Sequence, residues 1–185
     1  MAEASMTMTT CVSMLRGINV GGKNKVGMEA LKKLHESLGL GNVRTYVQSG
    51  NVVFECAAKE VTKMAERIGR KMKVALGLDI TVILRTRAEL QKVVDGNPFT
   101  DRDPDKLHVT FLAAVPGNVP REKIIGVKDE LEGFSVSGRD IYLYCPNGYG
   151  RTKLSNNFFE RVLETPATTR NWRTVNRLLV MMNGQ

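Results

Sequence analysis

Apolar positions change their spacing along the first half of the chain, and these changes predict its secondary structure. Short apolar runs are typical of buried strands, whereas apolar residues three or four apart are typical of amphipathic helices. Two β-rich runs around Ser49-Gly50 predict a hairpin. The expected elements are a strand at 11–15, a helix from Met28 to Leu38, a hairpin at 43–54, a helix at 61–76 and a strand at 80–84.

The pattern restarts after a polar, proline-punctuated stretch that predicts a linker. Its expected elements begin with a strand at 107–112, a helix from Pro120 that carries Ile124, Ile125 and Leu131, and a hairpin at 134–144 around Ser137-Gly138. A helix with Leu154, Phe158 and Val162 follows and ends near Pro166. A last helix places Trp172, Val175, Leu179 and Met182 on one face. A short helix at 88–94 precedes the linker. This half shows no evident fourth strand and ends in helices.

The order of elements predicts an α+β fold. A β-α-β-β-α-β order is the split β-α-β, or ferredoxin-like, arrangement. The two hairpins resemble each other closely, so we expect two ferredoxin-like subdomains from a degenerate internal duplication, with extra C-terminal helices. The alternative is two unrelated α+β halves that only look alike. The expected parts are a flexible N-terminal extension at 1–8, a first subdomain at 9–95, a linker at 96–105 and a second α+β subdomain with C-terminal helices at 106–185.

Composition excludes several classes of protein. Of the 185 residues, 42% are hydrophobic and 25% are charged, which argues against disorder, collagen and coiled coils. No apolar run approaches the roughly 20 residues that span a bilayer. The first ten residues lack the features of a signal peptide, so the sequence predicts a cytoplasmic protein without a membrane partner. It leaves the oligomeric state open.

The cysteines and histidines point away from disulfide and metal chemistry. The three Cys lie in or beside apolar strand-like runs, where a free thiol behaves as a small hydrophobe. The two His, His35 and His108, have no partners at the spacing of a zinc site. We therefore expect no metal and no cofactor.

Net charge and glycine content direct attention to one loop. The chain carries 27 Lys+Arg against 19 Asp+Glu, a formal net charge of +8. The loop 16–25 combines three Gly, two Asn and three cations between a strand and a helix, which suits an anion site although no Walker A motif is present. The candidate ligands here are Arg16, Asn19, Gly21, Gly22, Lys23 and Lys25. The alternative is a long connector with solvated lysines.

Three other segments supply further candidates for anion binding. The predicted topology brings Gln48, Ser49 and Asn51 of the first hairpin to the same end of the sheet as the loop 16–25. A second basic glycine segment, 147–153, supplies Arg151 and Lys153 and precedes a helix that Ser155 or Asn156 could cap. The C-terminal tail adds Arg170 and Asn171, and Thr169 could cap the final helix.

Two motifs carry a resemblance to a known family. The segments Leu15-Arg16-Gly17-Ile18-Asn19-Val20-Gly21-Gly22-Lys23-Asn24-Lys25 and Val43-Arg44-Thr45-Tyr46-Val47-Gln48-Ser49-Gly50-Asn51-Val52-Val53-Phe54 resemble the bacterial family known as domain of unknown function 1697. The segment Thr168-Thr169-Arg170-Asn171-Trp172 looks like that family's closing motif. The resemblance implies a duplicated α+β fold of two ferredoxin-like subdomains. It implies no activity.

These observations favour a binding module for a phosphate-bearing partner, either a nucleotide or a nucleic acid. No G-x-S-x-G elbow is present, and neither His nor clustered carboxylates lie near the expected pocket, so no catalytic residues can be named. One alternative is an enzyme acting on a small phosphorylated metabolite. Another is a protein-interaction scaffold whose loops are purely structural.

Overall fold

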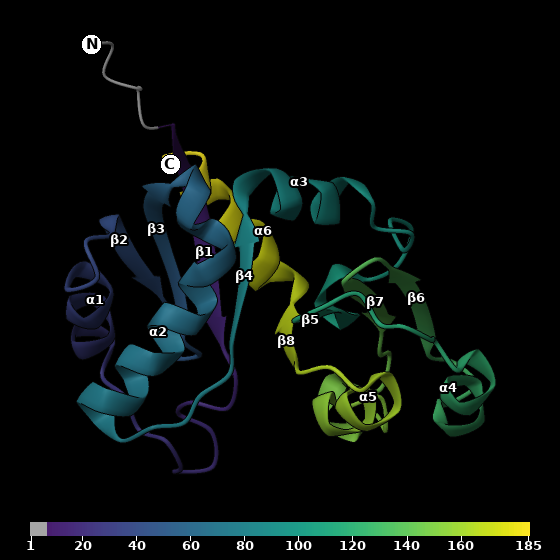
Figure 1. Cartoon of the computed structure of the whole chain (residues 1–185). Helices are drawn as coiled ribbons and strands as arrows, with labels where there is room; N and C mark the ends of the chain where they lie inside the picture. The colour runs from purple at the N-terminus through teal and green to yellow at the C-terminus, as the bar shows by residue number, and fades with distance from the viewer. Residues whose placement is uncertain (1–6) are drawn as a thin grey trace. The chain divides into compact units, whose positions relative to one another are not determined.

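The structure is a computed structural model that describes residues 7–185. The chain divides into two compact units, Met1–Leu90 with Leu178–Gln185 and Gln91–Arg177 (Figure 1). Each unit contains a four-stranded antiparallel sheet. The strand order of the first is β2 (Gly41–Tyr46), β3 (Asn51–Ala57), β1 (Met8–Leu15) and β4 (Val82–Thr86). That of the second is β6 (Gly133–Ser137), β7 (Asp140–Tyr144), β5 (Leu107–Leu112) and β8 (Ala167–Asn171). Most of the predicted extension, residues 1–6, lies outside the described residues, and Met8 already belongs to β1. Within the described residues no helix is long and apolar enough to cross a membrane.

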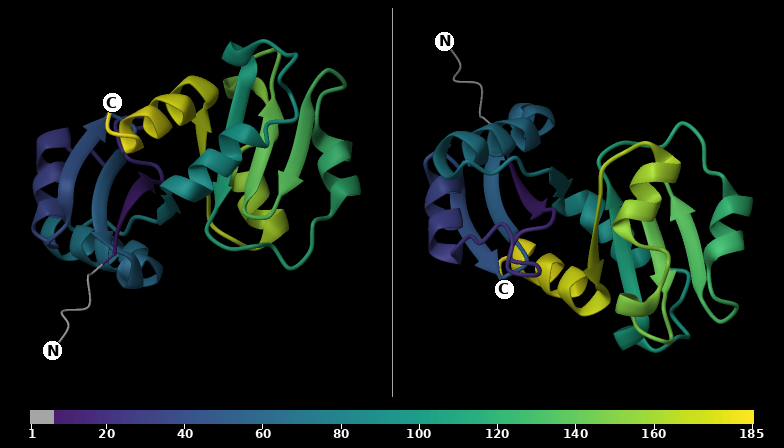
Figure 2. Two further views of the ribbon diagram at one scale, coloured as in Figure 1. Left: turned by 90° about the horizontal axis from the view of Figure 1, so that it is seen from above. Right: turned by 90° about the horizontal axis from the view of Figure 1, so that it is seen from below.

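The first unit is a sheet with two helices on one face (Figure 2). Sheet residues such as Phe54 pack against Leu31 of α1 and Ile68 of α2 in its core. This burial explains the apolar stripes of both helices. The elements are β1 Met8–Leu15, α1 Met28–Glu36, β2 Gly41–Tyr46, β3 Asn51–Ala57, η1 Ala58–Glu60, α2 Val61–Leu76 and β4 Val82–Thr86, followed by the start of α3 Arg87–Asp95.

The opposite face of this sheet is also buried. Val12, Met14 and Ile83 on this face are at most 1% exposed. Leu178–Gln185, which include the end of helix α6 (Trp172–Met182), belong to this unit. Arg44 Nη2 donates a hydrogen bond to the carbonyl oxygen of Met181. An arginine is favourable there because the C-terminus of a helix carries partial negative charge.

The second unit repeats the arrangement. Its core joins β5 and β7 to Ile124 of α4 and Phe159 of α5. The elements are η2 Pro104–Lys106, β5 Leu107–Leu112, α4 Arg121–Val127, β6 Gly133–Ser137, β7 Asp140–Tyr144, η3 Tyr149–Arg151, α5 Asn156–Leu163, β8 Ala167–Asn171 and the start of α6 Trp172–Met182. Ser155 caps α5, as predicted, by accepting a hydrogen bond from Phe158 N at 3.3 Å.

Three expectations for the second unit were wrong. A fourth strand does exist, because the polar segment Ala167–Asn171 pairs with β5 as β8. Helix α4 ends at Val127, which leaves Leu131 outside it and both Ile125 and Leu131 exposed. The cap of α6 is Asn171, whose Oδ1 accepts from Thr174 N at 2.8 Å. Thr169 instead hydrogen-bonds to Thr110 across the strand pair, at 2.7 Å.

The central strands β1 and β5 pair with their neighbours in corresponding registers. Val12 of β1 lies opposite Val53 and Arg85, and Val109 of β5 lies opposite Tyr142 and Arg170. A helix follows the fourth strand at once in both halves. The repeated element is therefore β-α-β-β-α-β-α, and the prediction of two ferredoxin-like halves with extra helices is confirmed.

Candidate functional site

The tip of the loop 16–25, here called the glycine loop, is a tight turn. Lys23 N donates to Val20 O at 3.1 Å, and the two residues between them, Gly21 and Gly22, have φ of 57° and 75°. Two consecutive positive φ values define a type I′ turn, which favours glycine at both positions. A Cβ at either glycine would meet open space, so backbone conformation rather than packing explains these glycines.

Asn19 ties the glycine loop to the hairpin turn between β2 and β3. Its Nδ2 donates to Val26 O at 2.9 Å and to Gln48 O at 2.8 Å, and its Oδ1 accepts from Val26 N at 2.8 Å. Asn24 Nδ2 also donates to Gly17 O at 3.0 Å. The loop and the turn are thus held together at one end of the sheet, as the predicted topology required.

The hairpin turn is organised from inside by Asn51. This side chain is 0% exposed, and its Nδ2 donates to Ser49 Oγ at 2.8 Å and to Tyr46 O at 3.2 Å. Asn51 therefore shapes the turn and does not face solvent. Gln48 is exposed beside Val47, a β-branched residue in the left-handed region with φ of 50°. Such a conformation is strained and is often found at binding sites.

The surface of the glycine loop is positively charged. Lys23 and Lys25 are exposed and form no ion pair with any described residue. The N–H groups of Gly21 and Gly22 likewise donate no hydrogen bond within residues 7–185. Arg16 is partly buried, and its backbone N–H donates a hydrogen bond to Thr81 O at 3.0 Å. Two backbone donors and two ammonium groups therefore remain available to an anion.

The remaining predicted residues belong to the second unit. Arg151 and Lys153 are exposed around η3. Arg170 is only 8% exposed, and its Nη1 donates to Thr168 Oγ1 and to Thr169 O, both at 2.8 Å. Burial lowers the pKa of Arg170 to about 10, which still leaves it charged at neutral pH. Asn171 caps α6, so these two tail residues have structural contacts.

A polar cluster that the sequence did not reveal lies beneath η3. His108 stacks on Tyr149 with 4.8 Å between ring centroids. The hydroxyl of Thr169 accepts from Tyr149 Oη at 3.0 Å and donates to Asn156 Oδ1 at 2.6 Å, while Thr110 Oγ1 lies 2.7 Å away as a second donor. One donor and two acceptors exhaust the capacity of a hydroxyl. The Thr169 hydroxyl is therefore saturated and joins η3 to the sheet, whereas Nδ1 of His108 is buried and has no hydrogen-bond partner among the described residues.

The cysteines have the environment predicted for them. Cys11, Cys56 and Cys145 are free and buried. Burial raises the pKa of all three thiols, that of Cys145 to about 12, so they stay protonated and weakly nucleophilic. No group of three or more His, Cys, Asp or Glu that could hold a metal ion occurs within residues 7–185.

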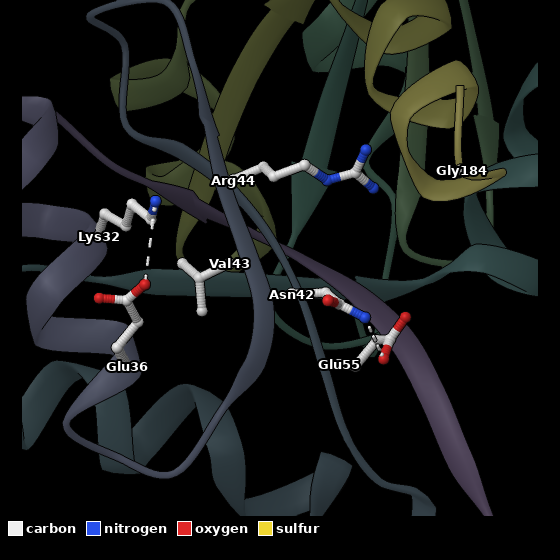
Figure 3. A pocket seen from close by; sticks show the side chains of 7 residues that line it. All are labelled: Lys32, Glu36, Asn42, Val43, Arg44, Glu55 and Gly184. Atoms are coloured by element: carbon white, nitrogen blue, oxygen red, sulfur yellow. Dashed lines mark hydrogen bonds and ion pairs between the residues drawn. The ribbon is translucent and has the colours of Figure 1, made fainter.

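One cavity in the first unit is lined by residues that no sequence motif singled out as ligands. It measures about 540 Å³ and is lined by Lys32, Glu36, Asn42, Val43, Arg44, Glu55 and Gly184 (Figure 3). These residues come from α1, β2, β3 and the C-terminal end. The signal in the sequence was weak, since of these residues only Val43 and Arg44 lie within a recognised motif, and neither was a candidate ligand.

Comparison with known proteins agrees with this architecture. The family described as Protein of unknown function (DUF1697) matches residues 8–142. The chain belongs to this family. The glycine loop, the hairpin turn and the cavity's α1, β2 and β3 residues all lie within the matched range, whereas Thr168–Trp172 lies beyond it.

A solved structure shares the fold. Conserved bacterial protein SP0830 from Streptococcus pneumoniae matches with a TM-score of 0.71 and 23% sequence identity, over 95% of this chain and 99% of that one. At this identity the likeness shows a common fold and no more. No curated protein matches this DUF1697 chain.

Proposed function

We propose that this DUF1697 protein is a binding module for a phosphate-bearing ligand, a nucleotide or a nucleic acid, at the glycine loop. One observation carries the proposal. The N–H groups of Gly21 and Gly22 have no acceptor among the described residues, and they adjoin two exposed lysines without a carboxylate partner.

The chemistry of this turn suits a phosphate group. Successive backbone N–H groups in a turn form a concavity that binds anions, and a turn built from glycines lets the anion approach the backbone. Ammonium groups add charge-assisted hydrogen bonds, which are stronger than neutral ones. Lys23 and Lys25 supply these, and the exposed amide of Gln48 adds a neutral donor and acceptor nearby.

Preorganisation of the loop supports the same function. Asn19 makes three hydrogen bonds that hold the glycine loop on the hairpin turn. A ligand would then bind without the cost of ordering this segment, which commonly weakens binding to flexible loops. The residues gathered here include no His or carboxylate, so the site suits binding better than proton transfer.

The test compares a double variant with a matched control. Lys23→Ala/Lys25→Ala should weaken binding of inorganic phosphate, a nucleoside monophosphate or a single-stranded oligonucleotide by at least about tenfold, measured by calorimetry. Lys59→Ala/Lys123→Ala removes the same charge from two exposed lysines elsewhere and should have little effect. No binding by the wild type, or equal losses in both variants, would contradict the proposal.

Two further measurements separate the alternatives. For a nucleic acid, the affinity should fall steeply with salt concentration because phosphate contacts release counterions. For a mononucleotide the dependence should be much shallower. A double variant that loses stability while wild-type protein binds no phosphate compound would favour the interaction scaffold.

A further inference from the structure

The cavity of the first unit lies around an edge strand, apart from the glycine loop. Strand β2 is at the end of its sheet, and the cavity includes groups from both sides of it. Figure 3 shows Lys32 and Glu36 on one side of Val43, with Asn42 and Glu55 on the other and Arg44 extending towards Gly184. Charged groups of both signs therefore surround one apolar residue.

The backbone of β2 is irregular where it lines this cavity. The register with β3 shifts between Gly41 and Arg44, and Asn42 has φ of 47°. Bulges of this kind re-aim side chains, and they are over-represented beside functional sites. Here Asn42 Nδ2 is directed to Glu55 Oε2, at 2.8 Å.

The charges that line the cavity are incompletely neutralised by one another. Among the described residues, Glu55 has a neutral amide as its partner, and Arg44 binds a backbone carbonyl oxygen. Lys32 and Glu36 are 3.9 Å apart and more than 40% exposed, so their attraction is weak. Two cations and two carboxylates remain able to bind a ligand.

We propose that this cavity binds a small zwitterion, an α-amino acid or a short peptide. The ligand carboxylate is recognised by Arg44 or Lys32, and its ammonium group by Glu55 or Glu36. The lining carries two positive and two negative side chains and has no net charge, so it favours a ligand with one positive and one negative group. A polyanion or a polyamine would meet two like charges in the same cavity.

The size of the cavity agrees with this ligand class. Small-molecule pockets commonly enclose about 300–1,000 Å³, and the volume here is about 540 Å³. Val43 is only 6% exposed, so the apolar contact that it offers is small. The charged side chains of the lining therefore carry the recognition.

The first experiment compares ligands that differ by one charge. NMR titration of the full chain with free α-amino acids and dipeptides should give saturable shifts at residues of α1, β2 and β3. The matching N-acetyl and carboxamide derivatives lack one charge each and should bind at least about tenfold more weakly. The Lys23→Ala/Lys25→Ala variant should retain zwitterion binding, so this outcome is independent of the proposed phosphate site.

The second experiment removes one lining charge. Glu55→Gln keeps an acceptor for Asn42 but removes the carboxylate, and it should weaken zwitterion binding by at least about tenfold. Glu29→Gln changes an exposed glutamate of α1 outside the lining and should bind normally. Thermal unfolding of both variants reports whether they are folded.

Three results would overturn the proposal. The first is the absence of saturable binding by any zwitterion below about 10 mM. The second is equal binding of the derivatives that lack one charge. The third is unchanged binding by a folded Glu55→Gln variant.

Discussion

Ser13 Oγ lies 3.0 Å from Nε2 of His35, and both side chains are 0% exposed. The other ring nitrogen, Nδ1, lies 2.8 Å from Leu31 O, which can only accept, so Nδ1 carries the proton of the neutral ring. Nε2 then accepts a hydrogen bond from the Ser13 hydroxyl. The pair has the spacing of a nucleophile and its base, but a buried serine cannot reach a substrate, so this pair is structural.

The first prediction concerns stability against pH. Burial lowers the pKa of His35 from 6.5 to about 4. The unfolded chain therefore binds more protons between these values, and the stabilising contribution is complete above pH 6.5 and is lost as pH falls to about 4. The expected loss is about 3 kcal/mol, and urea unfolding at a series of pH values would measure it. His35→Gln should have a shallower slope in this range, and an identical slope would contradict the assignment.

The second prediction removes the partner of this histidine. Ser13→Ala leaves the buried Nε2 of His35 without a donor, which should lower the free energy of unfolding by about 1–3 kcal/mol. Ser137→Ala is the control, since Ser137 is exposed at the end of β6. Its loss should be smaller in the same denaturation experiment. Equal losses would show that the buried hydrogen bond is unimportant.

The third prediction contrasts two glycines with positive φ. At Gly50, with φ of 74°, a Cβ would lie 2.6 Å from Ile18 Cδ1 and 3.0 Å from Leu15 Cβ. Gly50→Ala should therefore combine backbone strain with overpacking and cost about 2–5 kcal/mol.

Gly21→Ala is the matched control for this substitution. Gly21 has φ of 57° and open space around a Cβ. Gly21→Ala should therefore lower the free energy of unfolding only by the cost of backbone strain, about 1–2 kcal/mol. Thermal and urea unfolding of the two variants give the comparison. A Gly50→Ala variant as stable as Gly21→Ala would show that Ile18 moves aside freely.

The fourth prediction concerns the end of α6. Leu178, Leu179, Met181 and Met182 are at most 7% exposed and belong to the first unit, where Met181 O also accepts from Arg44. Deleting residues 178–185 should cost at least about 4 kcal/mol, enough to unfold a marginally stable domain. Deletion of the exposed residues 183–185 alone should be nearly neutral. Circular dichroism melting distinguishes these outcomes.

Strong periodicity made most elements predictable. The helix over Val61–Leu76 and the hairpin around Ser49-Gly50 were both confirmed. Strand β8 was missed because Thr168, Thr169 and Arg170 show no apolar alternation, although Thr168 and Arg170 are buried in the fold. Their burial depends on packing and pairing that a local pattern does not record.

The candidate site was predictable in position but not in the role of each residue. Asn19 and Asn51 were expected to bind a ligand, and the structure shows them holding the loop and the turn. Gly21, Gly22, Lys23, Lys25 and Gln48 remain exposed there and stay predictions. Arg44 and Glu55 of the cavity were not among the predicted ligands, since the irregular pairing of β2 with β3, which no local spacing records, places them on one cavity.

The sequence by itself determined the order of strands and helices, the duplicated architecture and the end of the first sheet where the glycine loop and hairpin turn meet. The spacing of hydrophobic residues and the identity of turn residues determine local structure, so both can be read directly from the sequence. Tertiary structure alone decided that β8 completes the second sheet, that the end of α6 belongs with the first unit, and that His35 is neutral beside Ser13. These features depend on burial and on contacts between distant segments, which no local spacing encodes.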